Sequence, residues 1–569
     1  MKTNRRLPMT ALLAALLLLV FTSACSPELS TQISQQVKQL FPSFVEPTPT
    51  PFQPLPPTRP PTPTPTLTPE PVKTLTAWLD PALPEALVAQ LKLPSDITIV
   101  PSAQAASLQI GALRGGEPEK AIWVYAVVTP FYTLTDEISL DEIQRAWRGE
   151  AGQTFSGPLT LSESTRAAFE ARWGPANTAR LKVQPDRQSL DEAWANRSGW
   201  ALIPFESIEP RWKVLRVDGM SLFDKSLQIN DWPLTVWFGV AGNAAALSQP
   251  GLNSLLPATN RDPNQMTVLI MTGTTALTRA TAYKMDTNGV TYPGRDIAPW
   301  LRNADLLHIS NEVSFNPDCP KANFYDTGMM FCSRPEYAGL LDYLGTKIVE
   351  LSGNHNNDWG VKADTYSLDL YQQHGWVTFA GGATLEDAEK PAKIENNGNK
   401  LAFIGCNAAG PGSAWATASS PGAAPCSDYG WLLDTVRQLR SEGYLPVVTF
   451  QYYEVYTHGL GSHQERDFKA AADAGAVIVS GSQAHFPQYM ELYNGSFIHY
   501  GLGNLFFDQM DVPVVGTREE FIDRHIFYQG KYIQTELFTA LLEDYARPRP
   551  MTADERRSFL QDVFSAAGW

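Results

Sequence analysis

The stretch IVELSGNHNNDWG, residues 348–360, decides both the fold and the candidate site. It opens with a β-branched pair and then breaks into a polar turn that holds the amide Asn354, the imidazole His355 and the carboxylate Asp358. A strand that ends in such a turn presents these three groups together at the edge of a sheet, where the functional loops of α/β proteins lie. A plainer interpretation is a polar turn that only caps a helix starting near Asp364.

Apolar and amphipathic runs alternate around this stretch, from residue 262 to residue 512. The runs that indicate strands and helices lie at 267–271, 305–309, 338–344, 348–351, 366–374, 401–404, 432–441, 447–451, 466–474 and 476–480. This alternation predicts an α/β fold with a layered sheet-and-helix architecture. Residues 513–569 continue the domain as a C-terminal extension, with a closing strand at 532–537 and a polar helix at 552–564.

The preceding region, residues 73–255, shows a similar α/β pattern. The run AIWVYAVV at 121–128 indicates a buried strand, and Ser139 opens a capping box ahead of an amphipathic helix. The segments 123–150 and 189–204 resemble strand-to-helix and helix-to-strand segments of type 2 periplasmic solute-binding proteins. That resemblance implies a solute-binding-like α/β domain, and a lobe that keeps the fold but binds nothing is the alternative.

The polar turn resembles the matching turn of the CapA family of capsule and poly-γ-glutamate synthesis proteins. In that family the turn reads Asn-Asn-His, followed three residues on by Asp and then by Gly. Asn354, His355, Asp358 and Gly360 match those positions, and Gly353 replaces the first Asn. The resemblance implies the layered fold of the calcineurin-like metallophosphatases, in which a Gly-Asn-His turn supplies an Asn metal ligand and a His that stabilises or protonates the reacting phosphate.

Further blocks follow in the order of the CapA family. The block IHYGLGNLFF at 498–507 is similar to the family signature Tyr-Ser-Leu-Gly-Asn-Phe. The other blocks lie at 272–279, 305–312, 380–383 and 475–485. A shared order of several short blocks is more specific than any one of them, so we place a CapA-like domain at 262–512.

Three positions depart from the family pattern. Thr274 stands where the family has Asp, and Gln451 and Gln483 stand where it has His. Carboxylate and imidazole bind divalent transition metals well, whereas neutral amide and hydroxyl oxygens bind them poorly. The sequence therefore argues against a tightly held two-metal centre and leaves room for one more weakly bound divalent metal ion or for a metal-free polar pocket.

The resemblance also implies roles for individual residues. If the domain is catalytic, His355 would act as general acid or electrostatic stabiliser and Asp358 would orient it. Glu312, Asn354 and His485 would lie near a metal. The reaction would then be hydrolysis or transfer of a phosphoester or an acyl-type linkage.

The first 25 residues have the layout of a secretory signal, with a positive start, an apolar run at 11–21 and small residues before Cys25. The segment Thr-Ser-Ala-Cys at 22–25 resembles a bacterial lipobox, which implies acylation of Cys25; ordinary cleavage that leaves a free cysteine is the alternative. Residues 26–72 form a linker whose Pro/Thr-rich stretch at 46–72 predicts an extended stalk or a plain spacer. We expect an extracytoplasmic protein that is lipid-anchored to a bacterial membrane.

Four other cysteines, an even number, would lie in an oxidising compartment, where thiols tend to pair. Adjacent pairing joins Cys319 to Cys332 and Cys406 to Cys426. A zinc site is less well supported because the sequence has no CxxC pair. The formal net charge of −15, without a Lys/Arg cluster, argues against a nucleic-acid partner.

These observations predict a CapA-like envelope lipoprotein that acts with a surface polymer or its synthesis machinery. Its role would be the synthesis, export or anchoring of a capsule or poly-γ-glutamate-type polymer, as a metal-dependent hydrolase. The first alternative is a non-catalytic polymer-binding or scaffold protein with a degraded metal site. The second is solute capture by the domain at 73–255.

Overall fold

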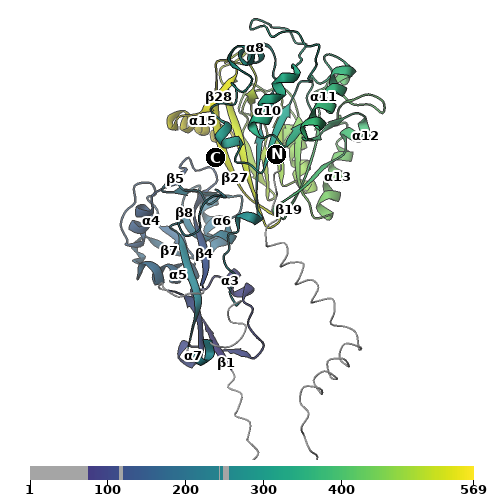
Figure 1. Cartoon of the computed structure of the whole chain (residues 1–569). Helices are drawn as coiled ribbons and strands as arrows, with labels where there is room; N and C mark the ends of the chain where they lie inside the picture. Colours follow the sequence, from purple (N-terminus) through teal and green to yellow (C-terminus); the bar gives the residue numbers. More distant parts are fainter. Residues whose placement is uncertain (1–74, 114–119, 243, 248–254) are drawn as a thin grey trace, which may run out of the picture. The chain divides into compact units, whose positions relative to one another are not determined.

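The computed structural model describes residues 75–569 except 114–119, 243 and 248–254 (Figure 1). Residues 73–569 form one compact unit. The expected signal segment, the lipidation site Cys25 and the Pro/Thr-rich stretch lie outside the described residues. Within the described part of the chain, no helix is both long enough and apolar enough to cross a membrane.

The region before residue 248 is built on a nine-stranded mixed sheet. Its strand order is β2-β1-β3-β11-β4-β8-β6-β7, with β9 paired to β4. The strands are β1 (Leu75–Leu79), β2 (Ile97–Ile99), β3 (Leu108–Ala112), β4 (Lys120–Pro130), β6 (Leu159–Leu161), β7 (Leu181–Val183), β8 (Trp200–Pro204), β9 (Trp212–Val214) and β11 (Thr235–Gly242), and a small pair joins β5 (Glu137–Ile138) to β10 (Arg216–Val217). The helices are α3 (Glu85–Gln90), α4 (Leu140–Trp147), α5 (Glu163–Trp173), α6 (Asp186–Asn196) and α7 (Ala244–Leu247).

The expected strand at 121–128 is confirmed as part of β4, and the expected helix after Ser139 is confirmed as α4. The capping box at this helix is only half formed. Ser139 Oγ accepts the N–H of Glu142 at 3.2 Å, but the Glu142 carboxylate accepts the Thr154 hydroxyl at 2.7 Å instead of reaching back to Ser139. The Glu142 carboxylate is thus hydrogen-bonded to the loop after α4, whereas in a full capping box it would accept the N–H of Ser139.

Two sheets build the region after residue 262. The first has the order β16-β15-β14-β12-β26-β27-β28, with β13 paired to β14 and β25; the second has the order β18-β19-β21-β22-β24-β23. The first contains β12 (Met266–Thr272), β13 (Thr274–Thr275), β14 (Leu306–Asn311), β15 (Ile348–Glu350), β16 (Val377–Phe379), β25 (Asn504–Phe506), β26 (Glu519–Tyr528), β27 (Lys531–Glu543) and β28 (Arg547–Pro550). The second contains β18 (Ala392–Asn396), β19 (Asn399–Asn407), β21 (Leu445–Gln451), β22 (Ile478–Ser482), β23 (Met490–Tyr493) and β24 (Ser496–His499), and a short pair joins β17 (Gly381–Gly382) to β20 (Gly422–Ala423).

Apolar clusters show how these layers pack. One cluster joins Leu269 and Ile348 of the first sheet to Phe403 and Val447 of the second, so the two sheets share a core. A second packs the first sheet against α8 (Arg279–Asn288), α9 (Ala298–Leu301), α10 (Ala338–Leu344) and α11 (Val361–His374). A third packs the second sheet against α13 (Gly430–Ser441) and α14 (Gln464–Ala474). The layers therefore follow the order helix, sheet, sheet, helix (Figure 1), which confirms the expected layered α/β architecture.

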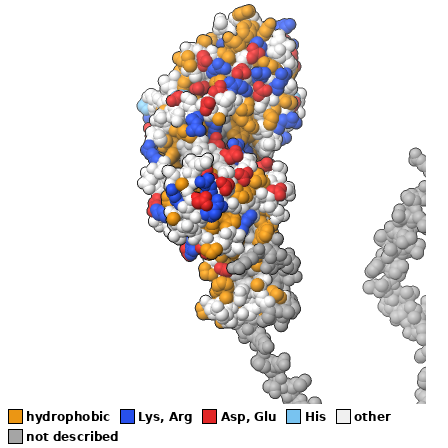
Figure 2. Space-filling model, turned by 90° about the vertical axis from the view of Figure 1, so that its left-hand side faces the viewer, with side chains coloured by type: hydrophobic (Ala, Val, Ile, Leu, Met, Phe, Trp, Pro, Cys, Tyr) orange, Lys and Arg blue, Asp and Glu red, His pale blue; other side chains and the backbone are white. Residues whose placement is uncertain are grey.

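This region also contains two further α-helices and two disulfide bonds. The short helix α12 covers Leu385–Ala388, and α15 covers Ala553–Ala566 and begins with a complete capping box at Thr552. The structure pairs Cys319 with Cys332 and Cys406 with Cys426, which is the adjacent pairing expected. On the face drawn in Figure 2, acidic and basic side chains lie next to one another instead of forming a patch of one sign.

A buried carboxyl in β26 makes the stability of this domain depend on pH. Glu520 is fully buried opposite Ala540 of β27, and neither of its carboxyl oxygens has a hydrogen-bond partner. Burial raises the pKa of Glu520 well above its ordinary value of 4.5. The folded protein therefore keeps a proton that the unfolded chain releases, and the stability present at low pH is lost as the pH rises toward the folded-state pKa.

We predict that Glu520→Gln removes this loss, because a neutral amide keeps the shape of the protonated carboxyl. Relative to wild type, the free energy of unfolding should rise by about 1.4 kcal/mol for each pH unit above the unfolded-state pKa, up to the folded-state pKa. At pH 4 the two proteins should have similar stabilities. Urea unfolding from pH 4 to pH 8 measures this difference, and two parallel stability profiles would contradict it.

Candidate functional site

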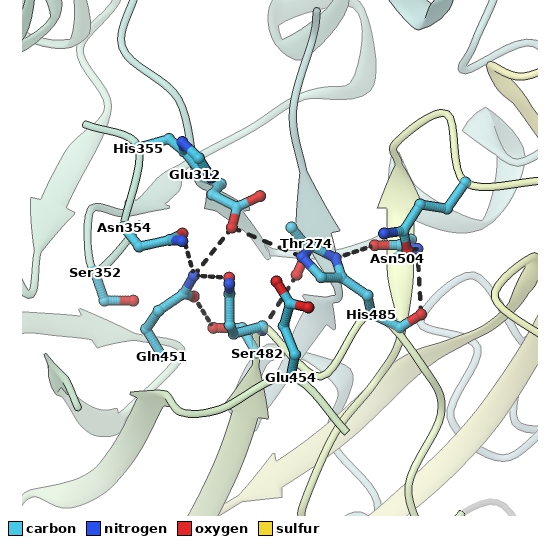
Figure 3. A network of polar contacts seen from close by, with 12 residues as sticks. Thr274, Glu312, Ser352, Asn354, His355, Gln451, Glu454, Ser482, His485 and Asn504 are labelled. Atoms are coloured by element: carbon cyan, nitrogen blue, oxygen red, sulfur yellow. Dashed lines mark hydrogen bonds and ion pairs between the residues drawn. The ribbon is translucent and has the colours of Figure 1, made fainter. Parts of the chain in front are cut away.

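Polar residues from both sheets meet where their strands end (Figure 3). Strands β14 and β15 are parallel neighbours in the first sheet, and β21 and β22 are parallel neighbours in the second. The carboxyl ends of neighbouring parallel strands lie at the same edge of a sheet. The residues brought together there are Thr274 in β13, Glu312 after β14, Asn354 and His355 after β15, Gln451 at the end of β21, and Ser482 and Gln483 at and after the end of β22.

The turn after β15 passes unusually close to the backbone after β14. A Cβ at Gly353 would lie 2.5 Å from both Cα and the carbonyl oxygen of Glu312. In the same place Val313 and His355 form a β-bridge. Only glycine permits this approach, and it sets Asn354 and His355 beside Glu312.

The amide of Gln451 occupies the centre of the site. Its Nε2 donates to Glu312 Oε1 at 3.2 Å, to Asn354 Oδ1 at 3.1 Å and to Oε1 of Gln483. Its Oε1 accepts the hydroxyl of Ser482 at 2.5 Å. Three acceptor oxygens thus share the two hydrogens of one amide nitrogen, and this network assigns the orientation of the amide.

His355 and Asp358 form a hydrogen-bonded pair at the rim of this network. His355 Nδ1 lies 2.6 Å from Asp358 Oδ2, which also accepts the Phe331 N–H at 2.7 Å. Burial lowers the pKa of His355, but the hydrogen bond to Asp358 and the negative charges of Glu312 and Asp358 together raise it above its ordinary value. The structure thus brings together the two residues that the resemblance assigned to catalysis, in the relation expected of an oriented imidazole.

His485 lies on the opposite side of Glu312. Its Nδ1 is 2.8 Å from Asn504 Oδ1, and its Nε2 is 4.0 Å from Glu312 Oε1. Both Gln483 and His485 have positive φ angles, of 74° and 53°, so the chain turns sharply after β22. Glu454 is exposed and accepts the hydroxyl of Tyr456 at 3.0 Å.

A stack of side chains connects the two histidines. The Phe331 ring lies 4.2 Å from the His355 ring, and the Phe507 ring lies 5.1 Å from the His485 ring. The Arg279 guanidinium lies 4.9 Å from the centre of Phe331 and 5.0 Å from the centre of Phe507, and it pairs with Asp508. A cation between two aromatic faces is an attractive arrangement that fixes both rings.

Sequence reasoning did not select Arg279 or Phe331 as site residues. Arg279 stands at the end of the block 272–279, so a signal for it was present. Phe331 had no such signal. It lies beside Cys332, whose disulfide with Cys319 closes the loop, and its N–H donates to Asp358.

The residues present do not fit a two-metal centre. Among the described residues, no group of three or more His, Cys, Asp or Glu side chains is arranged to hold a metal ion. The expected ligands Glu312 and Asn354 do converge, but on the Gln451 N–H group, which is a donor and cannot coordinate a cation. His485 adds one imidazole at the edge of the network, and Glu312 Oε2 is buried without a partner.

The fold and the site define a class: layered α/β proteins with a network of polar side chains at the strand ends of two facing sheets. Residues 268–509 match the model of the family described as "Bacterial capsule synthesis protein PGA_cap", and this domain belongs to that family. The match covers the two facing sheets up to β25 and includes every residue of the polar network.

Two curated relatives carry similar names. The chain is 26% identical over 331 residues to "Capsule biosynthesis protein CapA" of Bacillus anthracis, which covers 56% of this chain and 78% of that protein. It is 26% identical over 217 residues to "PGA biosynthesis protein CapA" of Bacillus subtilis (strain 168), which covers 37% of this chain and 56% of that protein. The chain thus spans just over half the length of the second relative.

Solved structures show weaker likenesses. The Haemophilus influenzae NAD nucleotidase NadN matches with 10% identity and a TM-score of 0.29, over 53% of this chain and 62% of that chain. An ABC-type phosphate transport receptor from Vibrio cholerae matches with 11% identity and a TM-score of 0.26, over 32% of this chain and 96% of that chain. Nothing about the ligands of this chain follows from scores this low.

Proposed function

We propose that this protein acts in the synthesis, export or anchoring of a capsule or poly-γ-glutamate-type surface polymer, and that its site binds the polymer without a two-metal hydrolytic centre. The family of residues 268–509 and the names of the two relatives support the first part. The position of the Gln451 amide, at the point where the oxygens of Glu312, Asn354 and Gln483 converge, carries the second part.

The chemistry of the site suits a polymer that contains amide bonds. Side-chain amides both donate and accept hydrogen bonds, as the amide links of poly-γ-glutamate do. Glu312 Oε2 is buried and has no partner inside the protein, so direct contact with the polymer is left to the partly exposed side chains of Asn354 and His355 at the rim. The His355 imidazole, oriented by Asp358, would donate to a carbonyl or carboxylate oxygen of the polymer.

The proposal includes a place for the protein in the cell. The secretory signal and the lipobox-like segment at 22–25 would put the protein outside a bacterial membrane, tethered through a lipid on Cys25. The Pro/Thr-rich linker would hold the folded part away from the lipid surface. Radiolabelled palmitate incorporation that is lost in Cys25→Ala would support the tether, and unchanged labelling would contradict it.

Metal analysis of a restored variant tests the main proposal. The wild-type protein should carry no divalent transition metal after dialysis, because the side chains at Thr274, Gln451 and Gln483 are neutral and bind such metals poorly. The triple variant Thr274→Asp, Gln451→His, Gln483→His replaces each neutral donor with the ligand type of the family, and it should hold about one or two equivalents of zinc or manganese. A control with two histidines on exposed helix positions, Gln372→His and Gln438→His, should hold none.

The unpaired oxygen of Glu312 favours a second candidate, a hydrolase that uses a single weakly bound divalent metal. For this candidate, wild-type protein titrated with manganese or zinc would bind about one equivalent of metal and would then shorten the polymer. That result would overturn the metal-free proposal. Absence of metal together with retained polymer binding would rule out the second candidate.

A further inference from the structure

A cavity of about 810 Å³ lies apart from the polar network just described. It is enclosed by the segment 213–227, by the end of α9, by β26 and β27, and by α15. All of these segments belong to the one compact unit. Its volume falls within the range of pockets that bind small molecules, and none of the residues of the Gln451 network lines it.

Paired charges form much of the cavity wall. Arg524 and Glu536 face each other across β26 and β27 and form an ion pair, and Arg524 also donates to the carbonyl oxygen of Phe223. Asp136 is bound by two cations, at 2.5 Å from Lys213 Nζ and 2.8 Å from Arg556 Nε.

The other two lining cations are paired with carboxylates just outside the cavity. Lys225 Nζ lies 2.7 Å from Asp305, and Arg216 Nε lies 3.6 Å from Glu137. The ionic groups in and around the wall are therefore close to neutral in sum. They remain rich in hydrogen-bond donors and acceptors that are held in fixed positions.

An aromatic surface completes the wall. The rings of Trp300 and Phe538 lie 4.8 Å apart, both side chains are partly exposed, and both line the cavity. Gln534 of β27 also borders the cavity, but its side chain is fully buried and offers no accessible acceptor.

These features select one ligand chemistry. A free anion would have to compete with the carboxylates already bound to each cation, and an apolar ligand would desolvate the ion pairs without replacing their hydrogen bonds. A neutral saccharide meets both requirements, because its hydroxyl groups donate to carboxylates and accept from guanidinium groups, while its C–H face lies on an aromatic ring. We propose that this cavity binds a segment of a neutral glycan chain.

This proposal does not depend on the function proposed for the Gln451 network. If both hold, the protein has one site for a capsule-type polymer and a separate site for a glycan, which is the arrangement needed to hold a polymer at a glycan surface. Variants in the cavity and variants at His355 therefore test the two proposals separately.

The test is isothermal titration calorimetry of the purified chain with three neutral probes: chitohexaose, cellohexaose and maltohexaose. We expect at least one to bind, and Trp300→Ala to weaken that binding about tenfold, since loss of an aromatic platform removes stacking of this order. Trp300→Phe should keep most of the affinity. Trp431→Ala on α13, a partly buried tryptophan outside the cavity, is the matched control and should bind as wild type does.

The three probes also distinguish the kinds of glycan that the cavity could bind. Preference for chitohexaose would indicate an N-acetylated glycan, and preference for either glucose polymer would indicate a plain hexose polymer. The proposal is overturned if none of the three binds, if Trp300→Ala binds as tightly as wild type, or if poly-γ-glutamate displaces the sugar from wild-type protein.

Discussion

Replacing Gly353 by alanine is expected to destabilise the protein by about 3 kcal/mol or more, because the new methyl group meets backbone that cannot move aside. The methyl carbon would lie 2.5 Å from Cα and the carbonyl oxygen of Glu312. The chain around Glu312 is fixed in turn, since its N–H donates to the carbonyl oxygen of Thr275 at 2.9 Å. Either the turn after β15 or the backbone at Glu312 must shift, and both positions belong to the site.

Urea unfolding measures this loss, with Gly157→Ala as the control. Gly157 is exposed, and a Cβ built on it meets nothing within 4 Å, so alanine there should change the stability little. The Gly353→Ala protein that remains folded should also bind the polymer more weakly, because Asn354 and His355 follow the shifted turn. Equal stability of Gly353→Ala and wild type would show that this close approach does not exist in the protein.

The same contact bears on a departure from the family pattern. The CapA pattern has Asn where this chain has Gly353, and an Asn side chain at this backbone position would begin with the same colliding Cβ. The turn of this chain thus lies closer to Glu312 than an Asn would allow. The same site has Gln451 where the CapA pattern has histidine. Its amide lies between the turn after β15 and the backbone at Glu312, and it donates to Asn354 and Glu312.

Removal of the His355 imidazole is expected to weaken binding of poly-γ-glutamate by about tenfold or more. The side chain is partly exposed at the rim of the site, where Asp358 and Phe331 hold its orientation. Asp358→Asn should weaken binding less than His355→Ala, because the ring stays in place against Phe331 while its hydrogen bond and the charge that favours its cationic form are lost.

Calorimetric titration of each variant with an oligomer of poly-γ-glutamate measures this effect. His374→Ala is the matched control, because this histidine also pairs with a carboxylate, Asp342, but lies at the end of α11 and outside the polar network. The assignment of His355 to polymer binding fails if His355→Ala binds as tightly as His374→Ala.

The sequence predicted the layered α/β architecture well, because the periodicity of apolar residues reports burial directly. The runs at 267–271 and 447–451 are parts of β12 and β21, the run at 348–351 extends one residue beyond β15, and the closing strand at 532–537 is part of the longer β27. The half-formed capping box at Ser139 shows the limit of a local pattern. The Glu142 carboxylate, which the pattern assigns to the N–H of Ser139, instead accepts the hydroxyl of Thr154, a residue beyond the helix.

The polar site could be predicted only in part. The turn at Asn354, His355 and Asp358 is a local motif, and its geometry follows from a strand that ends in a polar turn. The central position of Gln451 depends on the packing of two sheets against each other, which no local pattern encodes. The contact of Phe331 with His355 involves a disulfide-closed loop, so it too appears only in three dimensions.

The central claim is that the Gln451 network binds polymer without a metal ion. Its most direct test is calorimetric titration of wild-type protein with a poly-γ-glutamate oligomer, after dialysis against EDTA and again after addition of manganese or zinc. We predict the same affinity under all of these conditions, and binding that is about tenfold or more weaker in His355→Ala. Binding that appears only after the metal is added would contradict the account.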